Sequence, residues 1–429
     1  MIGAGVILLP FILHKMPQET VGIWNIFQTI TALVLLLDFG FRPTFARNIS
    51  YIFSGVKTLQ REGVAHTTRE AEVDYGLLKG SLIAMQRFYR WIALGVFGLL
   101  ATAGTAYFYY ILQKYSGDRQ DALVAWLLLI GINCYNLYTM YYDALLTGKG
   151  YVKRIQQLNM ISQLVYIGLA IGLIYAGFGL TAIVSSQLIS IIIRRILAYR
   201  TFFTAGMQVH LAEAVPQDAK EILKVISPNA IKIGLTHLGA FLITRSSILV
   251  GSAYLTLEEI ASYGITIQVM DVLSRCAQVL YIAYTPRLAQ CRAENDITQL
   301  RRYYIWCKVT YIGIFLLGGF VWIFFGDLAL QLIGSNTLFL ATPLLLLALA
   351  VGFLESNHAL SAGFIMADNR IPFFIPSLVS GAATFVLLWI FLGPCHLGVC
   401  GLILAPGFAQ LAYQNWKWPS VVIKELWGR

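Results

Sequence analysis

The stretch Tyr303–Phe325 reads YYIWCKVTYIGIFLLGGFVWIFF, and Lys308 is the one charged residue among its letters. At a rise of about 1.5 Å per residue, a helix of this length crosses the roughly 30 Å hydrocarbon core of a bilayer. The run Ile155–Leu180 contains no charged residue at all. Two such runs predict a protein that crosses the membrane as α-helices.

The composition of the whole chain extends this prediction. Of its 429 residues, 58% are hydrophobic and 12% are charged, whereas soluble domains carry about 25% charged residues. A water-soluble fold could not cover so much apolar surface. We predict an all-α integral membrane protein of about twelve spans, near residues 1–14, 21–53, 91–112, 122–147, 156–177, 180–203, 226–251, 260–285, 304–326, 337–366, 372–393 and 399–418.

Two of these spans have unusual lengths. The first apolar run, Ile2–Leu13, covers only about 18 Å as a helix, so we expect the natural chain to start roughly 10–20 residues upstream, with a short first helix as the alternative. The second span is long, and we expect it to break near Asp38–Gly40, where glycine relaxes the helix.

Lysine and arginine predict the orientation. Most of the 31 basic residues, Arg194 and Arg195 among them, fall in or beside alternate connections, and the longest of these is Lys57–Arg90. Cytoplasmic loops are enriched in these residues, so both termini are predicted to be cytoplasmic, in a bacterial inner membrane. The net charge of +10 is then a topology signal. It does not indicate a nucleic-acid surface, because there is no soluble domain to hold one.

The segment 204–225 divides the chain into a bundle of six spans at 1–203, whose first helix is truncated, and a second bundle of six at 226–429. Two internal echoes favour this doubling. Gly22 precedes Pro43 much as Gly264 precedes Pro286, in the second and eighth spans. The fourth and tenth spans end in the similar segments Ala144–Gly148 and Ala359–Gly363. Echoes at corresponding helices of the same orientation are typical of parallel repeats.

Several short motifs resemble those of a known family. Leu9-Pro10, Gly22–Trp24 and Leu36–Phe41 are similar to the opening of the Wzx-type polysaccharide flippases of the multidrug/oligosaccharidyl-lipid/polysaccharide exporter superfamily. The same resemblance continues at Ser227–Asn229, Ala261–Gly264 and Leu145–Gly150. It covers essentially the whole chain after the head of the first span. These motifs are loose, and they specify the superfamily better than the substrate.

The resemblance implies two six-helix bundles around a central cavity that alternates its opening. It also implies movement of an undecaprenyl-diphosphate-linked oligosaccharide, for O-antigen or capsule biosynthesis, with membrane lipid and other polysaccharide-assembly proteins as partners. One departure is Thr244-Arg245-Ser246, where relatives often carry an acidic residue. An arginine there makes the cavity more cationic and argues against direct transfer of an acidic coupling site.

Charges inside spans are costly and usually face a bundle interior or water. Asp38 with Arg42, and Asp271 with Arg275, are four residues apart, so each pair shares a helix face and is expected either to brace its helix or to face the substrate. Arg47 lies near the predicted cytoplasmic edge, where it either snorkels or binds substrate.

Lys232 and Arg245 have no acid within four residues and do not share a helix face. Each is either a cation facing the substrate diphosphate, for which an arginine fork is well matched, or a partner of Glu355 in the tenth span. Asp38, Asp271 and Glu355 are the candidates for ion coupling.

The fourth span is rich in polar and aromatic residues, of which Asn133, Asn136 and Tyr138 are candidate sugar contacts. The alternative is ordinary hydrogen bonding between helices. His237 and His358 are isolated on apolar helices and are expected to be core residues, with a role in a proton relay as the alternative.

The sequence contains no P-loop and no cluster of metal ligands, so we predict neither a cofactor nor an enzyme. Two alternatives to the flippase stay open. A cation-coupled multidrug exporter of the same fold should carry uncompensated acids in its first bundle. A membrane polysaccharide polymerase should carry a large external loop, whereas the external connections here are short.

Overall fold

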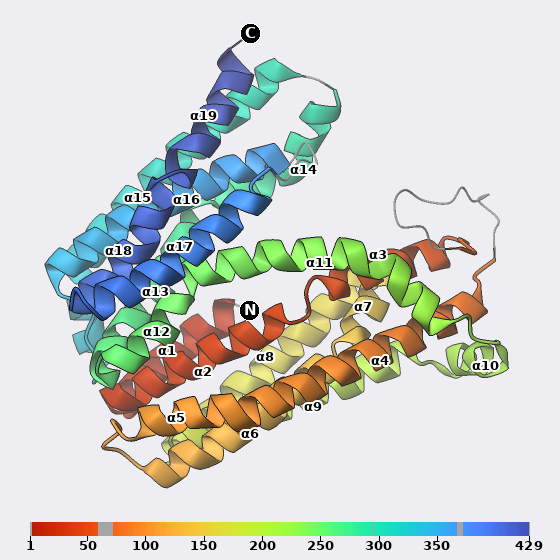
Figure 1. Ribbon diagram of the computed structural model, residues 1–429, viewed down its shortest axis with the longest axis horizontal. Coiled ribbons are helices and arrows are strands. Elements are labelled where there is room, and N and C mark those ends of the chain that lie inside the picture. Colours follow the sequence, from red (N-terminus) through yellow and green to blue (C-terminus); the bar gives the residue numbers. More distant parts are fainter. Residues whose placement is uncertain (1, 59–71, 295, 367–371, 429) are drawn as a thin grey trace. The chain divides into compact units, whose positions relative to one another are not determined.

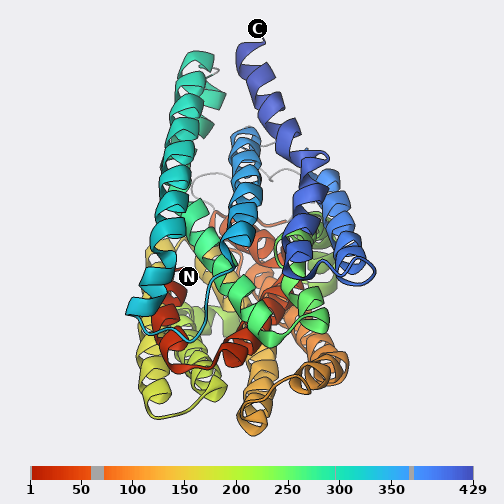
Figure 2. The same cartoon turned by 90° about the vertical axis from the view of Figure 1, so that its left-hand side faces the viewer.

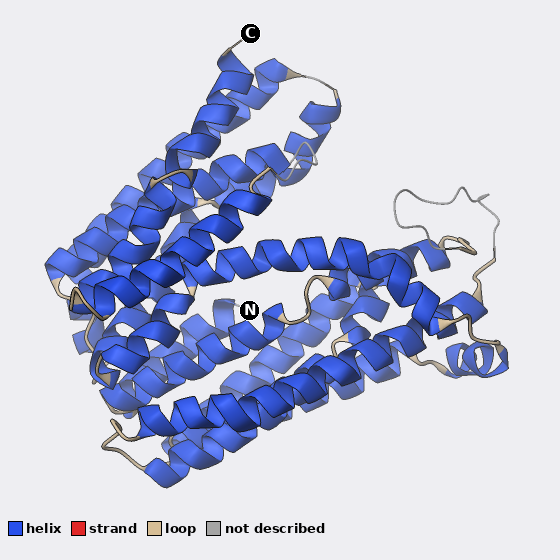
Figure 3. Cartoon of the chain, in the orientation of Figure 1, coloured by secondary structure: helices blue, strands red, loops and turns tan. Residues whose placement is uncertain are grey.

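The structure is a computed structural model that describes residues 2–58, 72–294, 296–366 and 372–428. Helices connected by short loops make up this part of the chain, and no strand occurs in it (Figure 3). The predicted all-α class is therefore confirmed. The helices form two compact units, which we treat separately.

Unit 1 comprises Met1–Lys15 and Ile30–His237. Its helices, in chain order (Figure 1), are α1 (Ile2–Lys15), the second part of α2 (Gln18–Leu36), α3 (Phe41–Phe53), α4 (Tyr75–Leu99), α5 (Thr105–Leu112), α6 (Arg119–Tyr138), α7 (Tyr141–Gly148), α8 (Val152–Tyr175), α9 (Leu180–Phe202), α10 (Ala205–Glu213) and the first part of α11 (Ala219–Thr244). A π-helical turn at Leu100–Gly104 joins α4 to α5. Helix α9 packs on α6, α7 and α8.

Unit 2 comprises Met16–Thr29 and Leu238–Arg429. It holds the first part of α2, the end of α11, and α12 (Ser246–Tyr254), α13 (Leu257–Ala277), α14 (Val279–Ala293), α15 (Ile297–Leu332), α16 (Thr342–Met366), α17 (Phe374–Leu392), α18 (Gly398–Leu411) and α19 (Gln414–Trp427). Figure 2 shows the long helix α15, in cyan, along its length.

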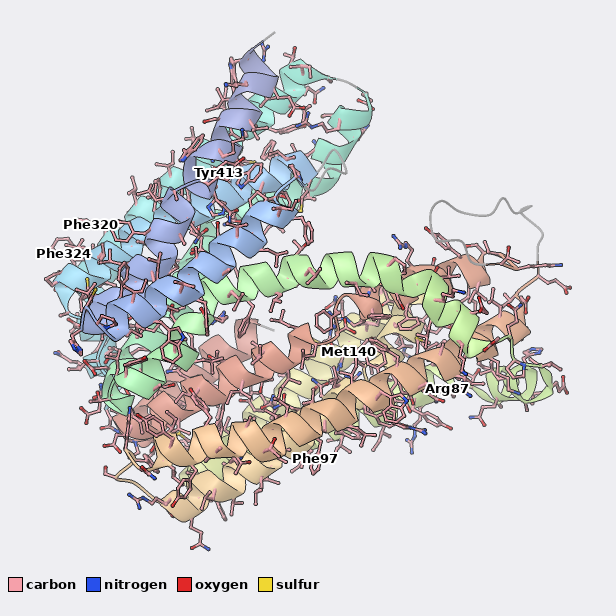
Figure 4. All side chains as sticks on the ribbon, in the orientation of Figure 1. Arg87, Phe97, Met140, Phe320, Phe324 and Tyr413 are labelled. Carbon is pink, nitrogen blue, oxygen red and sulfur yellow. The ribbon has the colours of Figure 1, made fainter. Side chains whose placement is uncertain are left out.

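In the described residues, eight helices are long and apolar enough to cross a membrane, and the bent pair α13–α14 brings the number to nine. The other predicted spans correspond to the short α1 and to the broken pairs α11–α12 and α18–α19. Phe320 and Phe324, labelled in Figure 4, are more than half exposed on α15. Such exposure of large apolar side chains suits a lipid-facing surface.

The second predicted span breaks where the sequence indicated. Helix α2 ends at Leu36, and Phe39 and Gly40 take positive φ angles of 45° and 70° before α3 begins. The Asp38 carboxylate then accepts the backbone N–H of Arg42 at 3.1 Å. This bond satisfies one of the free N–H groups in the first turn of α3.

Four more spans break at positions that were not predicted, and one of these breaks, at Ala412–Tyr413, separates α18 from α19. Helix α6 gives way to α7 at Thr139–Met140, the second of which is labelled in Figure 4. Arg245 separates α11 from α12, and Gln278 separates α13 from α14 with a bend of 52°. Irregular backbone in a membrane protein is tolerated where protein or water satisfies it.

The echo glycines Gly22 and Gly264 lie at one helix crossing in unit 2. A Cβ atom on Gly22 would meet the backbone carbonyl of Leu257 on α13, and a Cβ atom on Gly264 would meet the side chain of Asn25 on α2. The Asn25 carbonyl oxygen also accepts a 2.7 Å hydrogen bond from Gln268. Small residues on both helices let the two backbones approach closely.

In the second echo, the glycine that ends each segment packs closely against a neighbouring helix of its own unit. In unit 1, a Cβ atom on Gly148 would meet the Ile49 side chain on α3. In unit 2, a Cβ atom on Gly363 would meet the Tyr281 ring on α14. Both glycines thus lie against the helix that follows a break, α3 in one half and α14 in the other, which makes the two halves structurally comparable.

The segment predicted to join the halves contains α10. Lys79 on α4 donates hydrogen bonds to the carbonyl oxygens of Ala212 and Ala214 at 3.3 and 2.8 Å, at the end of α10. The rings of Tyr75 and His210 stack with their centroids 4.4 Å apart. These contacts hold α10 against the start of α4.

Candidate functional site

The most highly charged cluster within the spans of unit 1 surrounds Asp143 on α7. Arg194 on α9 donates hydrogen bonds to its two carboxylate oxygens at 2.7 and 3.3 Å. Arg195 places Nη1 3.1 Å from the same carboxylate. One carboxylate is therefore shared by two guanidinium groups, and the cluster carries one surplus positive charge.

Two asparagines orient these arginines. Asn136 on α6 accepts a 2.8 Å hydrogen bond from Nη2 of Arg195, and Asn159 on α8 accepts a 2.9 Å bond from Nε of Arg194. Helices α6, α7 and α8 thus each direct a polar group towards α9. A guanidinium whose position is fixed by second partners is suited to bind an anion without much reorganisation.

The other candidate sugar contacts of the fourth span have different surroundings. Asn133 is buried and donates to the Leu129 carbonyl at 2.9 Å and to the Thr31 hydroxyl at 3.4 Å, which are contacts within the bundle. Tyr138 is partly exposed, with its ring edge-to-face with Tyr141 at 6.3 Å. Only Asn136 among the three joins the charged cluster.

Asp38 does not pair with the guanidinium of Arg42. Its carboxylate accepts the Arg42 backbone N–H and a 2.7 Å hydrogen bond from the buried hydroxyl of Tyr89 on α4. The side chains of Arg42 and Arg47 are exposed on α3. Arg42 still acts electrostatically on both Asp143 and Arg194, so it adds to the positive charge of unit 1.

In unit 2, Arg245 pairs with Asp271 on α13, with Nη2 2.6 Å from Oδ2. Sequence spacing predicted Arg275 as the partner of Asp271, and it gave Glu355 only as an alternative partner for Arg245. In the structure Asp271 and Arg245 pair with each other. The side chain of Arg275 is exposed in the last turn of α13. Sequence spacing places two residues on one helix face, but a residue on a neighbouring helix can approach more closely.

Glu355 on α16 lies near this ion pair, since Asp271 and Arg245 both act on it electrostatically. Unit 2 thus has one ion pair with a second acid close enough to interact with it electrostatically. The charge balance is the reverse of that around Asp143.

The remaining candidates fall elsewhere. The side chain of Lys232 lies outside the described residues. His237 is exposed, whereas His358 is buried and its Nδ1 is 2.8 Å from the Asn415 side-chain oxygen. In the described part of the chain, no three His, Cys, Asp or Glu side chains lie together as a metal site, and all six cysteines are free.

The sequence analysis missed Arg194 and Arg195 as site residues because it counted them among the basic residues of a cytoplasmic connection. They lie inside α9, several residues before its end at Phe202. The sequence did contain a signal for this site. Both arginines fall within the predicted span 180–203, and Asp143 has no basic residue within four positions on its amino-terminal side that could pair with it.

Comparison with known proteins shows that the fold of this chain is similar to solved structures of membrane transporters. No family model and no curated protein matches the sequence. Among solved structures, a multidrug resistance MATE family transporter of the MOP superfamily, in an inward-facing conformation, matches with a TM-score of 0.70 at 14% identity, over 99% of this chain and 95% of that one.

The lipid II flippase MurJ, in an inward closed conformation, matches with a TM-score of 0.59 at 13% identity, over 95% of this chain and 86% of that one. A MOP superfamily transporter from Pyrococcus furiosus, described as having a binding pocket of reverse polarity, matches with a TM-score of 0.53 at 14% identity, over 99% and 94% of the chains. The chain is a multi-pass membrane protein with the fold of MOP superfamily transporters.

Proposed function

We propose that this protein is a flippase, without enzymatic activity, that moves an undecaprenyl-diphosphate-linked oligosaccharide from the cytoplasmic to the periplasmic leaflet of a bacterial inner membrane. It would serve O-antigen or capsule biosynthesis as a Wzx-type protein, alongside other polysaccharide-assembly proteins. Two six-helix bundles, 1–203 and 226–429, joined by the segment 204–225, would alternate access to the substrate, with both termini in the cytoplasm.

The observation that carries this proposal is the surplus of positive charge within the spans of unit 1. Two arginines share the single carboxylate of Asp143, and Arg42 adds a third guanidinium nearby. Buried cations are expensive in a membrane and are usually retained for function. A diphosphate is an anion whose oxygens match the guanidinium fork.

A cation-coupled multidrug exporter of the same fold is the second candidate. Unit 2 favours it, because Asp271 and Glu355 together exceed the charge of Arg245. Asp271 is already paired with Arg245, so a cationic drug would rely on Glu355 alone, whereas unit 1 offers several cations to an anion. We therefore place the substrate-binding cations in unit 1 and propose that Asp38, Asp271 and Glu355 contribute to ion coupling.

The proposal is tested by deleting the gene in its host and restoring it on a plasmid. Loss of surface polysaccharide, with build-up of undecaprenyl-diphosphate-linked oligosaccharide, is expected in the deletion strain and should be reversed by the wild-type gene. Unchanged surface polysaccharide with increased sensitivity to cationic drugs would favour the exporter.

A further inference from the structure

The two arginines that pair with Asp143 differ in the solvent exposure of their side chains. The side chain of Arg195 is 2% exposed and is anchored by Asn136. The side chain of Arg194 is 15% exposed and that of Asp143 is 13% exposed. A ligand that approaches the cluster would therefore reach Arg194 and Asp143 before Arg195.

The charge balance assigns different roles to these arginines. If Arg194 leaves Asp143, the acid keeps its contact with Arg195, 3.1 Å away, and the remaining pair is neutral. If Arg195 leaves, a cation with almost no access to solvent loses its counter-charge, which is far costlier. Arg194 is thus the one cation in the cluster that can change partner without leaving a buried charge unpaired.

The second half of the chain holds different residues at the position that corresponds to this cluster. Asp143 immediately precedes the echo segment Ala144–Gly148, and His358 immediately precedes its counterpart Ala359–Gly363. His358 on α16 bonds to Asn415 on α19, with 2.8 Å between Nδ1 and Oδ1. Unit 2 thus has a histidine–asparagine hydrogen bond between these helices at the position where unit 1 has one acid and two arginines.

Arg42 increases the electrostatic attraction of an anion to the cluster around Asp143. Its exposed guanidinium on α3 acts electrostatically on Asp143 and on Arg194. A phosphate group near Arg194 would interact with two cations from different helices, whereas Asp143 is one monovalent carboxylate. A doubly charged ligand can compete with that carboxylate.

We infer that Asp143 is an internal counter-ion that holds Arg194 when no substrate is bound, and that a phosphate of the substrate diphosphate displaces it from Arg194. Arg195 stays on Asp143 throughout and keeps the acid paired. This inference rests on the proposed function for the identity of the ligand, but the exchange itself requires only a polyvalent phosphate anion.

The experiment titrates inorganic pyrophosphate into the purified protein in detergent and follows its melting temperature, with sodium chloride at matched ionic strength as the reference. Wild type should gain a saturable stabilisation beyond that of chloride. Arg194→Ala should abolish it and Arg194→Lys should weaken it, because lysine keeps the charge and loses the fork.

Asp143→Asn is the decisive variant, because it removes the competitor and should let pyrophosphate saturate at a concentration about tenfold lower. Arg154→Ala is the matched control, since Arg154 is exposed and bonds only to Gln157 in the described structure at 3.1 Å; it should behave as wild type. Should Asp143→Asn fail to accumulate, the wild-type and Arg194→Lys titrations decide the matter.

Equal responses of wild type to pyrophosphate and chloride, or an unshifted midpoint in Asp143→Asn, would overturn the inference. Surface polysaccharide is measured in the same strains, so that failure of this inference can be distinguished from failure of the proposed function. Pyrophosphate binding with normal polysaccharide in the deletion strain refutes the function and leaves the site intact. Polysaccharide export that depends on the gene, without pyrophosphate binding, refutes the site alone.

Discussion

Arg245, at the break between α11 and α12, forms an ion pair with Asp271 of α13, with 2.6 Å between Nη2 and Oδ2. The pair joins the residue that ends one helix to a residue seven positions before the next break, at Gln278. The contact therefore joins the first break to the interior of α13, about two helical turns before the second break. A membrane environment strengthens such a contact, because less water competes for the charges.

This pair predicts a pattern of rescue. Arg245→Ala should lower the melting temperature of the protein, since Asp271 loses its counter-ion and still repels Glu355. The double variant Arg245→Ala, Asp271→Asn should recover most of the loss. Arg275→Ala, on the same helix as Asp271 but exposed, is the control and should match wild type; a double variant no more stable than Arg245→Ala would show that the pair has no structural role.

The glycine crossing in unit 2 predicts unequal effects of two similar substitutions. Gly22→Ala should destabilise the protein by about 1–3 kcal/mol, because its new Cβ meets the backbone carbonyl of Leu257, which cannot rotate away. Gly264→Ala should cost less, because it meets the side chain of Asn25, which can move. Melting temperatures in detergent measure both.

Gly98→Ala serves as the control for this comparison. Nothing lies within 4 Å of a Cβ atom at Gly98 in α4, and alanine is the better helix former, so this change should leave stability equal or slightly higher. Equal losses at Gly22 and Gly264, or a loss at Gly98, would contradict the close approach of α2 and α13.

The hydrogen bond from Tyr89 to Asp38 predicts that removal of the Tyr89 hydroxyl lowers the stability of the protein. Tyr89→Phe should destabilise unit 1 by about 1–3 kcal/mol, since a buried carboxylate loses one of its donors. Tyr109→Phe is the matched control, because the Tyr109 side chain is 62% exposed. A melting temperature for Tyr89→Phe equal to that of the control would rule out a structural contribution from this bond.

The orientation of the chain is tested by labelling with a thiol reagent that does not cross membranes. Our topology predicts that the exposed natural Cys395, between α17 and α18, is modified in intact cells after the outer membrane is permeabilised. A cysteine placed at the exposed Glu294 should react only after lysis. The reverse pattern would invert the topology and contradict cytoplasmic termini.

Local features of the sequence were sufficient for the span positions. Apolar length is a local property, so the runs that contain α8, α9 and α15 could be read directly. The break at Asp38–Gly40 was also readable, because glycine at a positive φ angle is a local signal. The break at Arg245 has no glycine or proline beside it, and so the sequence carried no local signal there.

Contacts between helices were beyond the reach of sequence spacing. The i, i+4 rule paired Asp271 with Arg275, but the nearest cation comes from another helix. Arg194 and Arg195 were counted as loop charges because positively charged residues near span ends usually are. Their pairing with Asp143 depends on the packing of α7 against α9. That packing is a property of the folded bundle and cannot be predicted from spacing along the sequence.

Reconstitution tests the central claim most directly. The purified protein is placed in liposomes that contain a fluorescently labelled undecaprenyl-diphosphate-linked oligosaccharide in both leaflets, and a reductant that cannot cross the membrane is added outside. We predict that wild-type protein exposes the inner-leaflet label to the reductant, that Arg194→Ala slows this strongly, and that Arg154→Ala does not. Protection of the inner-leaflet label in wild-type liposomes, equal to that in empty liposomes, would contradict the account.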